Sequence, residues 1–364
     1  MYSFEPTDEQ KMLVEAISRY ATGNLRQEMR EADEENHLKP EMIEKGWELG
    51  FLQASIPEEF GGFGDYSAIT SVLAAEEFAY GDLAGALALM TPGLFAFPIL
   101  LAGSDEQKHA YLPPLVEGEW KPYTAALMEL RYGFDPYDLS TIAREDVDHY
   151  VINGEKAYVP YARDAEAMLV YAKLDGNTQG FIIPKGAEGV QVGERQKLLG
   201  IHALPVYTVA FKDVQVSKEN RLGGPQGHAI DRILAASQVV QASMAVGMSR
   251  AAFEYARDYA KDREVFGMKV AQKQAIAFML AEMATEIESI RLLSWEAAWM
   301  LDNEKEEAFR QAYLALTGAA DMAMMVTDRA VQILGGHGYI REHPVELWMR
   351  NGRGFATFQG LAVA

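Results

Sequence analysis

The sequence predicts an α+β protein in which a β domain is inserted between two helical regions. Apolar residues recur at helical spacing in the first third of the chain. Short strand-like runs, separated by glycine and proline, then occupy residues 122–220, and long amphipathic segments return after the turn at 223–225. A chain of 364 residues is long enough for roughly two or three structural units. We expect three units with the bounds 1–121, 122–224 and 225–364.

The first region is expected to be helical from residue 7. Thr7 followed three positions later by Gln10 is a capping-box pattern that opens a helix. Pro57 and the glycine run at 61–64 predict a loop before the next helix, at about 67–80.

Residues 83–104 carry no charge and are long enough to cross a bilayer. Pro92, Gly93 and Pro98 interrupt this stretch, and such breakers favour buried helices over a membrane span. We therefore expect no membrane span.

The middle region has the pattern of a β domain. The stretch "DHYVINGEKAYV" predicts two strands joined by a turn at Asn153-Gly154, a strong hairpin signal. Further strands are expected from the runs "AMLVYAKL", "TQGFIIP", "GVQVGE" and "VYTVAFKDVQV".

The last region returns to long amphipathic helices. Short loops near 263–269 and 302–305 predict antiparallel neighbours, as in a bundle. Gly335 and Gly336 end the third helix in the usual C-terminal manner. The expected helices are 227–262, 270–302 and 305–334.

Composition limits the possible functions. The formal net charge of −20 argues against nucleic acid, because binding to a phosphate backbone needs a basic surface. The absence of cysteine excludes disulfides, thiolate nucleophiles, zinc–thiolate sites and iron–sulfur clusters. No segment resembles a signal peptide, which predicts a cytoplasmic protein. His337 and His343 have no third ligand at a suitable spacing, so we interpret them as loop histidines and expect no metal site.

Six motifs, in order, resemble the acyl-CoA dehydrogenase family, and the resemblance covers essentially the whole chain. They are "LGFLQASIPEEFGGFG" (49–64), "GSDEQKHAYLPPLVEGEW" (103–120), "INGEKAYV" (152–159), "DREVFG" (262–267), "QAIAFMLAEMA" (274–284) and "AVQILGGHGY" (330–339). The resemblance implies a helical domain, a β-barrel domain and a four-helix bundle, assembled as a dimer of dimers.

The resemblance also implies a chemistry. Family members oxidise an acyl-CoA thioester between its α and β carbons: a glutamate removes the α proton and a hydride passes to N5 of FAD. An electron-transfer flavoprotein is the acceptor that this chemistry implies. The family builds each flavin site from two chains, one of which supplies the isoalloxazine pocket and the base.

The half of the flavin site that a chain gives to its neighbour matches the family pattern. An arginine can pair with phosphate oxygens, and glycines let backbone N–H groups approach an anion. The matching cofactor-binding residues are Arg263, Phe266, Gln274, Gln332, Gly335 and Gly336.

The chain's own isoalloxazine pocket departs from the family pattern. Met128 and Phe134 stand where the family has a threonine and a serine that face the cofactor. Pro160 ends the segment that corresponds to the family's "W-I-T", and it offers neither an N–H nor a hydroxyl. We therefore expect a degenerate flavin pocket.

No catalytic residue is predicted. "FATFQGL" aligns with the family's "I-Y-E-G-T", so Gln359 occupies the base position and Leu361 replaces a threonine. A neutral amide cannot act as a general base. Some family members carry the base on the first bundle helix instead, but Ser237 and Gln238 occupy that location here.

Three hypotheses follow. In the first, the chain is a non-catalytic subunit that shares FAD with a homologous acyl-CoA dehydrogenase chain in a dimer or a dimer of dimers. In the second, it is an active flavoenzyme with a relocated base. In the third, it is a structural or ligand-binding paralogue without flavin.

Overall fold

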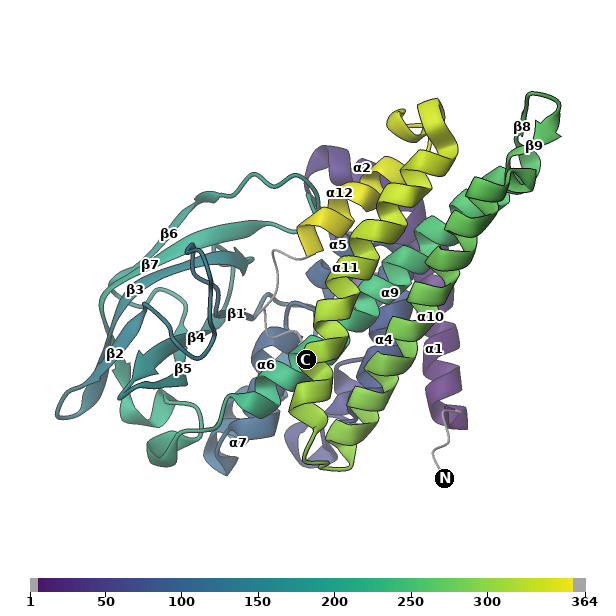
Figure 1. Cartoon of the computed structure of the whole chain (residues 1–364). Helices are drawn as coiled ribbons and strands as arrows, with labels where there is room; N and C mark the ends of the chain where they lie inside the picture. Colours follow the sequence, from purple (N-terminus) through teal and green to yellow (C-terminus); the bar gives the residue numbers. More distant parts are fainter. Residues whose placement is uncertain (1–5, 356–364) are drawn as a thin grey trace.

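The computed structural model describes residues 6–355 and confirms the expected order of helices, strands and helices (Figure 1). The helices before the first strand are α1 (Asp8–Tyr20), α2 (Arg26–Glu35), α3 (Pro40–Trp47), α4 (Ala68–Gly81), α5 (Leu83–Leu89), α6 (Gly93–Ala102), α7 (Asp105–Tyr111) and α8 (Pro113–Val116).

The two local predictions for this region are confirmed. The Thr7 hydroxyl accepts the Gln10 N–H, and the Gln10 side chain returns to the Thr7 N–H, so the capping box is complete. The helix expected at 67–80 is α4, and the Ser67 side chain caps it by accepting the Thr70 N–H.

The uncharged stretch at 83–104 forms the short helices α5 and α6. Every residue of α5 is buried within the protein. Within residues 6–355, no single helix has the length and apolarity needed to cross a membrane. Together α5 and α6 reach that length and composition, but they meet at an angle of 55°.

The middle region is one seven-stranded sheet in the order β1-β4-β2-β3-β7-β6, with β5 paired to β4. In the described part of the chain β1, β5 and β6 each have a hydrogen-bond ladder with one strand, so the sheet curls without closing into the expected barrel (Figure 1). The strands are β1 (Thr124–Ala126), β2 (Ile142–Glu145), β3 (His149–Pro160), β4 (Ala167–Leu174), β5 (Asn177–Pro184), β6 (Val190–Arg195) and β7 (Val206–Ser217).

The sheet joins two cores because side chains alternate along its strands. Met168 and Val170 of β4 pack inside the curled sheet. Leu169 and Tyr171, from the same strand, belong to the larger core that continues into the helices. The sheet is therefore held firmly against the helical part of the chain.

The predicted hairpin at Asn153-Gly154 is wrong. β3 runs unbroken from His149 to Pro160, and Gly154 lies at an irregularity in its pairing with β7. A Cβ atom on Gly154 would lie 2.6 Å from the Thr141 Cα atom. The glycine therefore permits a close approach of two backbones, and does not form a turn.

The region after the sheet has three long helices that pack on one another, followed by a shorter one (Figure 1). An ion cluster ties this region to α4, because the buried Glu76 carboxylate accepts hydrogen bonds from Arg250 at 2.7 Å and Arg291 at 3.0 Å. The helices are α9 (Asp231–Asp262), α10 (Gln274–Asp302), α11 (Ala308–Leu334) and α12 (Val345–Phe355).

Candidate functional site

The loop expected at 263–269 is a small β-hairpin. Arg263 leaves α9 in an extended conformation, and β8 (Glu264–Val265) then pairs antiparallel with β9 (Met268–Lys269). Phe266 and Gly267 form the two-residue turn, with φ values of 56° and 75°. Figure 1 shows the hairpin projecting beyond the ends of the helices.

Two predicted site residues face outward from this hairpin. Phe266 is 94% exposed, although positive φ is an uncommon and costly conformation for an aromatic residue. Its ring touches the Lys273 ammonium, which lies 5.6 Å from the ring centroid. Within residues 6–355, the exposed Arg263 guanidinium has no hydrogen-bond or ion-pair partner. Apart from this contact with Lys273, the two side chains are exposed and available to another molecule.

The glycine turn lies after α11. The Gly335 N–H is bonded to the carbonyl groups of Val331 and Gln332, which ends the helix. A Cβ atom on Gly335 or Gly336 would meet no atom within 4 Å, and Gly336 lacks the positive φ that favours glycine. The fold of this chain does not explain Gly336. A ligand that approaches the backbone closely would explain it.

The structure brings these pieces to one end of the long helices. The Tyr259 carbonyl of α9 accepts the Arg263 N–H at 2.8 Å, and the Tyr259 hydroxyl is hydrogen-bonded to His337 Nδ1 at 2.6 Å. Gln274, also exposed, begins α10 at the same end. Thus the six predicted residues, which come from α9 and its hairpin, from the start of α10 and from the end of α11, lie toward one end of the long helices.

The two histidines of this region are held by tyrosines. His343 Nδ1 is hydrogen-bonded to the Tyr255 hydroxyl at 2.7 Å, in parallel with the bond between Tyr259 and His337. The centroids of the two imidazole rings lie 5.5 Å apart. The prediction of simple loop histidines missed this arrangement, because sequence spacing does not show which tyrosine a loop histidine meets.

The positions of the chain's own flavin pocket are occupied by packed side chains. Met128 is only 8% exposed, and its carbonyl accepts the Ala157 N–H at 2.9 Å. Pro160 is buried and lies opposite Val206 of β7. Phe134 is half-buried against the main core.

Backbone donors of the same segment are also engaged within the chain. The Tyr158 N–H donates to the Gln196 side chain at 2.8 Å, and the Tyr161 N–H donates to the Pro205 carbonyl at 2.9 Å. These donors flank Pro160, which has no N–H of its own. The backbone donors on either side of Pro160 are therefore already bonded within the chain.

A buried ion pair lies next to Met128, and no motif in the sequence predicts it. The Lys156 ammonium donates to Glu129 Oε1 at 2.9 Å and to the Leu127 carbonyl at 3.0 Å. Burial lowers the pKa of Lys156 to about 8, so the group is still charged at neutral pH. Burial opposes ionisation of Glu129, but the Lys156 ammonium and the N–H groups of Ser140 and Thr141 outweigh it and lower its pKa to about 2.

Of the two locations considered for a catalytic base, the structure describes only the one on α9. Ser237 on α9 is buried and accepts a hydrogen bond from the Gln241 amide at 2.9 Å, and Gln238 beside it is half-buried. Gln359 and Leu361 lie outside the described residues.

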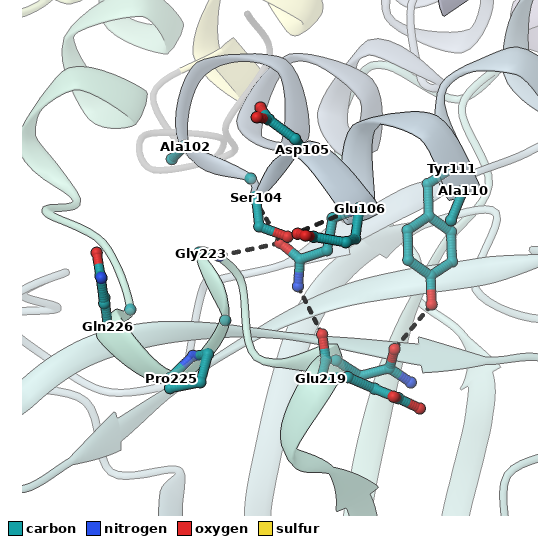
Figure 2. A pocket seen from close by; sticks show the side chains of 15 residues that line it. Ala102, Ser104, Asp105, Glu106, Ala110, Tyr111, Glu219, Gly223, Pro225 and Gln226 are labelled. Carbon is teal, nitrogen blue, oxygen red and sulfur yellow. Dashed lines mark hydrogen bonds between the residues drawn. The ribbon is translucent and has the colours of Figure 1, made fainter.

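A separate cavity of about 900 Å³ contains none of the predicted site residues. Figure 2 shows Ser104 and Asp105 at the start of α7 on one side and Gly223 and Pro225 on the other. Gln107 joins the two sides. Its amide donates to the carbonyl groups of Glu219 and Arg221 at 2.8 and 2.7 Å. The side-chain oxygen of Gln107, Oε1, accepts hydrogen bonds from the backbone N–H groups of Ser104 and Gly223.

We expect Gln107→Leu to lower the free energy of unfolding by about 1–3 kcal/mol, since the carbonyl groups of Glu219 and Arg221 and the Gly223 N–H lose their partner. Gln10→Leu removes another capping-box glutamine, which has one bond outside its cap, to the Thr70 hydroxyl, and should cost less. Urea denaturation of both variants provides the measurement. Equal losses would show that Gln107 acts only as a helix cap.

The comparisons with known proteins agree along the whole chain. Family models match residues 7–119, 124–214 and 227–362, as the acyl-CoA dehydrogenase N-terminal, middle and C-terminal domains. The short-chain specific acyl-CoA dehydrogenase of Sus scrofa mitochondria is 34% identical over 98% of this chain and 88% of its own length. The caffeyl-CoA reductase–Etf complex subunit CarC of Acetobacterium woodii is also 34% identical, over 97% of this chain and 95% of its own.

A solved structure extends the agreement to the fold. Butyryl-CoA dehydrogenase from Megasphaera elsdenii superposes with a TM-score of 0.89 at 33% identity. The match covers 99% of this chain and 96% of that one. Together with the three family models and the two relatives, this superposition confirms the resemblance seen in the sequence: the chain belongs to the acyl-CoA dehydrogenase family.

Proposed function

We propose that this chain is a non-catalytic subunit of a heteromeric acyl-CoA dehydrogenase and that it gives half of a FAD site to a homologous catalytic chain. One contrast carries the proposal. Arg263 and Phe266 are exposed and available at the bundle end, whereas Met128 and Pro160 are packed into the positions where the chain's own flavin would lie.

The outward-facing residues suit the phosphates and adenosine of FAD. The Arg263 guanidinium can form two parallel hydrogen bonds to pyrophosphate oxygens. The backbone at Gly335–Gly336 is open to an anion, and the Phe266 ring is free to stack. The family and the relatives support FAD as the cofactor.

The partner would provide the rest of the reaction. It would hold the isoalloxazine ring, carry the glutamate base and oxidise an acyl-CoA thioester between its α and β carbons. One relative is named as a subunit of an Etf complex, which supports an electron-transfer flavoprotein as the acceptor.

We expect the chain expressed alone to be nearly colourless, even after incubation with FAD. Met128, Phe134 and Pro160 offer no side-chain hydroxyl to the flavin ring, and all three are buried or half-buried in the chain. The measurement is the visible flavin absorbance per chain after gel filtration. The comparison is a tagged chain purified from its native host, with co-purifying homologues identified by mass spectrometry.

The two samples distinguish the alternatives. A native complex with fewer flavins than chains, whose partner carries the family's glutamate and threonines, would support the proposal. A yellow homotetramer with one flavin per chain would contradict it and would favour an active flavoenzyme with a relocated base.

A further inference from the structure

The arginine and the glycine turn of the proposed FAD half-site follow different helices. Arg263 follows α9, whereas Gly335 and Gly336 follow α11. The pyrophosphate and adenosine of FAD are covalently joined, so the two parts of the half-site bind one cofactor most tightly when their spacing is preorganised. A contact between the two helices can set this spacing.

We infer that Tyr259 is a positioning residue that fixes the arginine relative to the glycine turn, an inference that rests on the proposed function. Its carbonyl accepts the Arg263 N–H at 2.8 Å, which sets where the arginine leaves the helix. Its hydroxyl is bonded to His337 Nδ1 at 2.6 Å, one residue beyond Gly336. The two rings also meet edge to face, with centroids 5.9 Å apart.

Among residues 6–355, no other hydrogen bond joins the two parts, although the His343 ring packs against the rings of both Tyr259 and His337. The Arg263 carbonyl accepts the Val270 N–H, which closes the hairpin onto the start of α10 but does not reach the turn. Gly335 is bonded only to carbonyl groups of its own helix. Removing the Tyr259 hydroxyl therefore frees the turn to shift while α9 and α11 stay packed.

Tyr255 provides a matched control. It lies one helical turn earlier on α9, and its hydroxyl makes the same kind of bond, at 2.7 Å, to His343 Nδ1. Neither Tyr255 nor His343 is next to a half-site residue in the sequence, and the Tyr255→Phe change keeps the ring packing of His343 against Tyr259 and His337. Tyr255→Phe thus removes an equivalent hydroxyl and an equivalent bond from the same helix.

The experiment uses the native complex with the variant chain, and FAD itself as the probe. Tyr259→Phe should raise the Kd for FAD about three- to tenfold, the effect of losing one hydrogen bond that positions a binding group. The kcat at saturating FAD and the Tm of the chain should be unchanged, because the hydroxyl touches neither substrate nor flavin. Tyr255→Phe should change Kd by less than about twofold.

Variants at His337 give a rescue test. His337→Gln keeps a side chain that can bond the Tyr259 hydroxyl, and His337→Leu does not. The glutamine variant should therefore retain more FAD affinity than the leucine variant. Equal Kd values for the two would contradict a positioning role.

Two further outcomes separate this inference from the proposed function. If Arg263→Ala weakens FAD binding but Tyr259→Phe does not, the half-site stands and the inference about Tyr259 is wrong. If Arg263→Ala has no effect, the proposed function itself fails. Equal effects of Tyr259→Phe and Tyr255→Phe would indicate general loosening of α9 and would overturn the inference.

Discussion

Replacing Lys156 with methionine is expected to lower the free energy of unfolding by about 3–5 kcal/mol, because it leaves the buried Glu129 carboxylate without its counter-charge. Lys156 is 0% exposed, so water cannot replace the lost ammonium. The Leu127 carbonyl loses its donor as well. The methionine fills nearly the same volume, so the loss reports the charge and not a cavity.

Urea denaturation of matched variants measures this effect. Lys173 on β4 makes a surface pair with Asp138 at 2.8 Å, and Lys173→Met should cost less than about 1 kcal/mol. The double variant Lys156→Met/Glu129→Gln should recover much of the loss, because no unpaired charge remains. Similar small losses at Lys156 and Lys173 would contradict a buried ion pair.

The same pair predicts a fall in stability at acid pH. The pKa of Glu129 is lowered to about 2 in the folded chain, whereas an unfolded glutamate titrates near about 4.3. The unfolded state therefore binds the proton more readily. The contribution of Glu129 is fully present above its unfolded pKa and is lost as the pH falls toward 2. The unfolding midpoint of the Lys156→Met variant should depend less on pH in this range.

Local signals in the sequence predicted much of the fold. The capping box at Thr7 and Gln10 and the strand "AMLVYAKL" are found where they were expected, since side chains and backbone within a few residues determine them. The prediction of a turn at Asn153-Gly154 is wrong because Gly154 lies against the backbone of Thr141, just before β2. Such long-range backbone contacts leave no local pattern that distinguishes them from a turn.

The site shows the same division. The resemblance to the family motifs indicated Arg263 and Phe266, and the structure places both at one exposed hairpin. Tyr259 and Lys156 were missed, because each depends on a partner from another element. A tyrosine or lysine within an ordinary helix or strand pattern carries no sign of such a partner. Contacts between elements are therefore what the sequence alone left out.

Arg263→Ala is expected to weaken FAD binding by the native complex about tenfold or more, since a hydrogen bond to a charged group contributes roughly 1.5–3 kcal/mol. The fold of the chain should change little, because removal of an exposed side chain usually costs within about 0.5 kcal/mol. Arg144→Ala, at an exposed arginine of β2, is the control and should leave FAD affinity unchanged. Phe266→Ala should act in the same direction as Arg263→Ala.

The opposite result is expected at Gln359. If this chain has no working site of its own, Gln359→Ala should leave the turnover of the complex nearly unchanged, because an amide supplies no base for the α proton. FAD affinity and turnover, measured for both variants in one preparation, give the test. The difference between the two variants decides whether the chain acts through the half-site that it gives to its partner or through a site of its own. A large loss at Gln359 with none at Arg263 would mean that this chain's own site is the working one, and that its base lies elsewhere.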